Sequence, residues 1–79
     1  MKRTIISLTH KDKSTAVFKV WGAPEDVERT ILENFMTRGV TSLALADGLV
    51  DGEEKEVTIL IFKDDIAYIR LAEWEKDNE

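Results

Sequence analysis

The residues best suited to covalent chemistry in this chain are its serines and its single histidine. Ser7 and His10 lie three positions apart, and a hydroxyl beside an imidazole is the pairing used in nucleophilic catalysis. The residues around them alternate as in a β-strand, where positions three apart point to opposite faces. No glycine-framed nucleophile elbow surrounds Ser7. We therefore expect His10 to be a surface residue at a strand end.

The carboxylates are the second group with possible chemistry. Two Asp-Gly pairs, at residues 47–48 and 51–52, precede Glu53, Glu54 and Glu56. Their oxygens could hold calcium, but the spacing does not match an EF-hand loop, whereas Asp-Gly is a strong turn signal. Zinc is disfavoured because the chain has one histidine and no cysteine. The sequence predicts no metal, no cofactor and no catalytic residue.

Composition restricts the partners further. The chain has 79 residues, 43% hydrophobic and 34% charged, with a net charge of -5. Binding to duplex nucleic acid is disfavoured, because release of counterions requires a cationic surface. No run approaches the roughly 18 apolar residues that span a bilayer, and residues 1–9 are too polar for a secretory leader. We expect a cytoplasmic protein with no membrane contact.

One small α+β domain is expected at this length, over residues 1–74, followed by a frayed acidic tail at residues 75–79. Alternating residues predict strands, and a segment with helical periodicity interrupts them. The fold class is one helix packed on a five-stranded, mainly antiparallel sheet or half-barrel, in the order β-β-α-β-β-β. The strands are expected at residues 4–10, 15–21, 40–46, 57–62 and 66–74.

The helix has clear signals at both ends. Pro24 suits the first helical position, and the acidic residues 25–26 fall in the first turn, where the helix dipole favours negative charge. Arg38 and Gly39 supply a cation and a left-handed residue at the other end. We predict a helix over residues 24–38.

Two of the predicted strands differ in sequence from a typical half-buried strand. Residues 57–62 are apolar on both faces, which indicates a central strand. Residues 66–74 favour a strand, but their composition has fair helix propensity and an acidic pair precedes them, so a helix remains the alternative.

The two faces of the predicted sheet carry different kinds of side chain. The face toward the helix is expected to carry Ile6, Leu8, Ala16, Phe18, Val20, Leu43, Leu45, Val57, Ile59, Ile61, Ala67, Ile69 and Leu71. The other face would carry aromatic and cationic residues that are typical of interfaces. If the sheet curls into a barrel, part of this second face becomes interior instead.

The apolar arc of the helix is also wider than a surface helix needs, since Leu32 and Met36 extend it. Glu28 lies near the middle of this arc. Its carboxylate either reaches solvent or free backbone N–H groups, or contacts a ligand or partner. The predicted partner-binding residues are Lys19, Trp21, Glu28, Leu32, Met36, Phe62, Tyr68, Arg70 and Trp74.

These surfaces favour a non-catalytic protein-binding module, a small inhibitor or regulator that acts by surface coverage, as a homodimer or larger assembly. One alternative is a homo-oligomer that binds a small nucleotide-like ligand, with Lys19, Arg70 or Arg38 holding its anionic group. A second alternative is single-stranded nucleic acid on the aromatic sheet face. The RNA-binding aromatic and glycine pattern is missing, and the net charge has the wrong sign.

In size and composition alone, the chain resembles phage-encoded host-takeover and anti-defence proteins. Like them it is short, acidic and free of cysteine. The likeness covers no motif and transfers no residue role.

Overall fold

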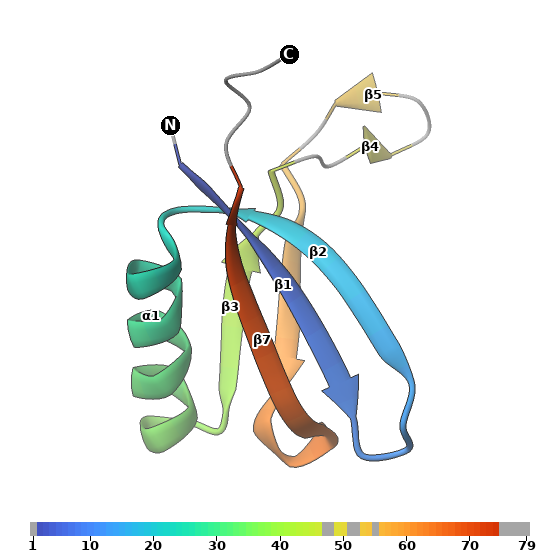
Figure 1. Ribbon diagram of the computed structural model, residues 1–79, viewed down its shortest axis with the longest axis vertical. Helices are drawn as coiled ribbons and strands as arrows, with labels where there is room; N and C mark the ends of the chain where they lie inside the picture. The colour runs from blue at the N-terminus through green and yellow to red at the C-terminus, as the bar shows by residue number, and fades with distance from the viewer. Residues whose placement is uncertain (1, 47–48, 51–52, 55, 75–79) are drawn as a thin grey trace.

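Two β-sheets and one helix form the body of the molecule (Figure 1). The structure is a computed structural model that describes residues 2–46, 49–50, 53–54 and 56–74. Its elements are β1 (Arg3–His10), β2 (Thr15–Trp21), α1 (Pro24–Thr37), β3 (Val40–Ala44), β4 (Leu49–Val50), β5 (Glu53–Glu54), β6 (Thr58–Phe62), the 3₁₀ helix η1 (Lys63–Asp65) and β7 (Ile66–Trp74).

The α+β class is confirmed, but the single five-stranded sheet is wrong. One sheet has the order β2-β1-β7, a second pairs β3 with β6, and β4 pairs with β5, all antiparallel. The element order also differs, because β4 and β5 lie between β3 and β6. The helix carries the chain away from the first sheet after β2. Among the described residues, one isolated bridge links β2 to the segment after β3, between Val20 and Leu45.

The helix begins and ends where the sequence places it, to within one residue. Pro24 occupies the first turn with acidic residues after it, and Arg38 is the C-terminal cap rather than part of the last turn. Gly39 follows with a φ of 73°, the left-handed conformation that glycine adopts without strain. This glycine turns the chain directly from α1 into β3.

Seven buried apolar side chains from both sheets and the helix form the core. They are Ile6, Leu8, Val20, Val27, Ile31, Leu43 and Ile61. Val27 and Ile31 come from α1, so one face of the helix is buried against the two sheets. Burial of such side chains contributes about 1.5–3 kcal/mol each. The helix therefore holds the two sheets around a common interior.

Two buried threonines tie the helix to the strands before and after it. The Thr4 hydroxyl donates to the carbonyl of Gly22 at 2.8 Å. The Asn34 amide donates to the Thr41 hydroxyl at 2.9 Å. Both threonines are almost completely buried, so each bond satisfies a polar group that would otherwise be costly. These bonds fix both ends of α1 against the sheets.

Residues 66–74 form a strand, which confirms the favoured prediction over the helical alternative. The expected inward position of Ala67 is wrong. Thr9 pairs with Tyr68 but His10 pairs with Ile66, so Ala67 is the extra residue of a β-bulge. The bulge turns Ile66 toward the core and leaves Ala67 exposed.

The expectation that residues 57–62 form a central strand is also wrong. Among the described residues, β6 pairs only with β3. Its outer face exposes Leu60 and Phe62, at 61% and 51% of their surfaces. The Asp-Gly pairs and the acidic tail predicted at residues 75–79 lie outside the described residues.

The bulge makes a direct prediction about stability. We expect Ile66→Ala to lower the free energy of unfolding by about 1–3 kcal/mol, because Ile66 packs partly against the core. Ala67→Ser should change it by less than about 0.5 kcal/mol, as at an ordinary surface position. Urea unfolding of both variants measures these changes. A larger loss for Ala67→Ser would mean that the strand has the unbulged register.

Candidate functional site

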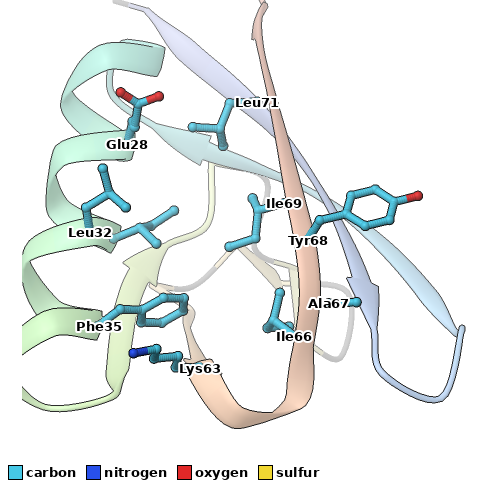
Figure 2. Close-up of a pocket in the computed structure, with 10 residues that line it drawn as sticks. Glu28, Leu32, Phe35, Lys63, Ile66, Ala67, Tyr68, Ile69 and Leu71 are labelled. Carbon is cyan, nitrogen blue, oxygen red and sulfur yellow. The ribbon is translucent and has the colours of Figure 1, made fainter.

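A groove separates helix α1 from strand β7 (Figure 2). Its volume is about 470 Å³. The residues that line it are mostly apolar and come from α1, η1 and β7: Glu28, Ile31, Leu32, Phe35, Lys63, Ile66, Ala67, Tyr68, Ile69 and Leu71. Of the predicted partner-binding residues, the structure brings Glu28, Leu32 and Tyr68 together here.

The strand side of the groove is an edge of the first sheet. Among the described residues β7 pairs only with β1. Tyr68 lines the groove, although its side chain points away from α1 in Figure 2. We infer that Tyr68 contributes its main chain to this wall. The groove therefore gives access to peptide groups as well as apolar side chains.

Opposite charges stand at the two ends of the groove. Glu28 lies near Leu71 at one end, and Lys63 lies near Phe35 at the other, as Figure 2 shows. Both residues are exposed, and neither has an ion-pair partner among the described residues. The exposed Glu28 side chain reaches solvent at the mouth of the groove, and its contact with a ligand or partner stays a prediction.

Leu32 and Met36 differ in their relation to this groove. Leu32 lines it and is 54% exposed. Met36 is one helical turn further along and 83% exposed, but it is not part of the lining. The groove therefore uses only part of the wide apolar arc of α1.

A stack of cations and aromatic rings occupies the outer face of the first sheet. Arg3 pairs with Trp21 on one side and Trp74 on the other. Its guanidinium carbon lies 4.6 Å from the ring centre of Trp21 and 5.0 Å from that of Trp74. The Lys19 Nζ atom lies 4.1 Å from the Trp74 ring centre. The structure thus brings three predicted partner-binding residues together: Trp21 and Trp74 flank Arg3, and Lys19 contacts the Trp74 ring.

Arg3 is the residue of this stack that the sequence analysis missed. The first strand was expected to begin at Thr4, which left Arg3 outside the sheet. The sequence did offer a signal: Arg3, Ile5 and Ser7 are alternate residues, and alternate residues of a strand lie on the same face. Arg3 Nε and Nη1 are buried and make no hydrogen bond to any residue that the structure describes. The guanidinium is therefore held mainly by the rings on either side.

Tyr68 and Arg70 lie on the same strand, beyond this stack. The Arg70 guanidinium carbon is 6.0 Å from the Tyr68 ring centre. Phe62 does not join them, because it belongs to the β3–β6 sheet. The single aromatic face expected from the sequence is therefore divided between two sheets.

The β3–β6 sheet has an unusual composition. None of its ten residues is charged, although 34% of the whole chain is. Leu60 pairs with Ser42, and Phe62 pairs with Val40. The outer face of this sheet is thus an uncharged strip on an acidic protein.

The serine and histidine considered first do not form a catalytic pair. Ser7 pairs with Val17 and Arg70 within the sheet, whereas the His10 Nδ1 lies 3.3 Å from the carbonyl oxygen of Ser14. In the same turn, Asp12 Oδ1 accepts from the Ser14 hydroxyl and backbone N–H. These bonds lower the pKa of the Asp12 carboxyl and stabilise the turn.

Neither a metal-binding cluster nor a membrane-spanning helix occurs among the described residues. No group of three or more His, Cys, Asp or Glu side chains is placed to hold a metal ion there. No helix in that part of the chain is long and apolar enough to cross a membrane. Comparisons with protein-family models, curated proteins and solved structures found no match.

The stack makes a prediction about its two tryptophans. Trp74 is contacted by two cations and is the less exposed ring, whereas Trp21 is contacted by one. We expect Trp74→Ala to lower the free energy of unfolding by about 1 kcal/mol more than Trp21→Ala. Urea unfolding of both variants measures the difference. An equal or larger loss for Trp21→Ala would contradict this arrangement.

Proposed function

We propose that the protein is a non-catalytic protein-binding module that takes up a segment of another protein in the groove between α1 and β7. One observation carries this proposal: an apolar groove runs along an edge of β7 that pairs with no other described strand. An edge strand offers main-chain hydrogen bonds to an added chain, and pockets beside it can receive alternate side chains. Binding there would cover a partner's segment, as an inhibitor or regulator does.

The lining of the groove favours a protein segment over a small ligand. Its volume is within the range of small-molecule sites, about 300–1,000 Å³. Such sites contain several convergent polar groups that orient the ligand. Here the charged side chains, Glu28 and Lys63, stand at opposite ends with apolar residues between them. This arrangement suits an elongated occupant.

The cation-aromatic stack argues against single-stranded nucleic acid on the first sheet. Bases bind such surfaces by stacking on free aromatic faces. Arg3 and Lys19 already contact the rings of Trp21 and Trp74. A base would have to displace these cations before it could stack.

Two substitutions on α1 test the groove. Leu32→Lys places an ammonium among apolar lining residues, whereas Met36→Lys makes the same change outside the groove. Peptides selected from a random displayed library on the wild-type protein should bind Leu32→Lys roughly tenfold more weakly, because a charge must then be desolvated. Met36→Lys should bind them as the wild type does.

Binding is measured by fluorescence anisotropy, with circular dichroism to verify folding. Failure to select any peptide, or equal losses in the two variants, would contradict the proposed site.

A second candidate function, self-association, is favoured by the uncharged β3–β6 sheet. β6 has a free edge among the described residues and an apolar outer face. Natural edge strands are usually protected by charges, prolines or bulges, and β6 has none of these. Antiparallel pairing of two copies centred on Leu60 would place each Phe62 opposite a Thr58.

Sedimentation equilibrium tests this second candidate. We expect the wild-type protein to form a dimer and Leu60→Lys to shift it to monomer, because paired lysines would repel at the centre of the interface. Val17→Lys, at an exposed position on the other sheet, should leave the dimer intact. A wild-type monomer across the accessible concentrations would rule out this interface.

A further inference from the structure

We infer that the groove binds an extended peptide antiparallel to β7, with a cationic side chain toward the peptide's N-terminus and a carboxylate side chain toward its C-terminus. This inference rests on the proposed function and specifies its occupant. It follows from the edge of β7 that no other described strand covers, the apolar floor and the charges at the two ends.

The strand edge determines the backbone conformation of the occupant. β7 pairs with β1 along its length, and Tyr68, whose side chain points away from α1, lines the groove on the other side. A chain that pairs with this edge must be extended and lie about 4.8 Å from β7. Antiparallel pairing is slightly more stable per residue than parallel pairing.

The floor of the groove determines the pattern of the peptide's side chains. Ile31 and Phe35 approach from α1, and Ile69 and Leu71 approach from β7. Alternate residues of an extended peptide point to the same face. One residue in two should therefore be apolar and point into the groove.

The two charges determine the direction of the peptide. β7 runs from the Lys63 end of the groove to the Glu28 end (Figure 2). An antiparallel peptide therefore enters at Glu28 and leaves at Lys63. Charge complementarity then requires a lysine or arginine near the peptide's N-terminal end and an aspartate or glutamate near its C-terminal end.

The length of the groove determines the spacing of these charges. Glu28 and Phe35, beside which Lys63 lies, are separated by a helical rise of about 10 Å. An extended chain covers this distance in about three residues. Both charged side chains must point to the groove side, so their spacing must be even. The cation should therefore precede the carboxylate by four positions, with an apolar residue pointing into the groove midway between them.

A display experiment tests this direction. Random peptides are presented within a loop of a carrier protein, so that no free terminus is available, and are selected on the wild-type protein. A parallel selection uses the charge-swapped variant Glu28→Lys/Lys63→Glu. Leu32→Lys serves as the groove-disrupted control. Circular dichroism verifies that each protein is folded.

The inference predicts that wild-type selections enrich peptides in which the cation precedes the carboxylate, and that the charge-swapped protein enriches the reverse order. Peptides that require Leu32 but show no preferred charge order would overturn the inference and leave the proposed function standing. No enrichment over the Leu32→Lys control would overturn both.

Discussion

The burial of Val27 and Ile31 between the two sheets is the interaction on which the rest of the structure depends. These side chains join α1 to a core built from β1, β2, β3 and β6. The hydrogen bond from Thr4 to Gly22 fixes the chain entering the helix, and the bond from Asn34 to Thr41 fixes the chain leaving it. The helix thereby lies beside β7, and within the described part of the chain that strand has one edge paired with β1 and one edge without a strand partner.

The outer face of the first sheet carries positive charge, although the protein as a whole is acidic. Arg3 and Lys19 concentrate positive charge there, and the rings of Trp21 and Trp74 hold it. Because these contacts are internal, the aromatic surface is less available to a partner than its composition indicates. The groove, in contrast, exposes apolar side chains and charged ends that have no ion-pair partner among the described residues. This difference is why the proposed binding site is the groove rather than the aromatic face.

Local sequence signals predicted the elements well, because periodicity and helix-end residues act over a few positions. Pro24 and Gly39 placed the helix, and alternation placed the strands of the first sheet. The pairing of strands into separate sheets depends on contacts between distant residues, such as Val20 and Leu45, which local patterns do not encode. The bulge at Ala67 shifted the register by one residue, and this moved Ala67 out of its expected inward position and brought Ile66 against the core. Glu28 and Leu32 were predicted as contacts, but Lys63 was missed because only the tertiary fold brings it to the end of the groove.

Amide hydrogen exchange along β7 tests most directly whether its outer edge is open to a partner. In the free protein, the amides of β7 that point away from β1 should exchange much faster than those paired with β1, because among the described residues only the latter belong to a strand pair. Binding of a selected peptide should protect the fast amides while those of β2 remain unchanged. Uniform slow exchange along β7 in the free protein, or unchanged fast exchange in the bound state, would contradict the account.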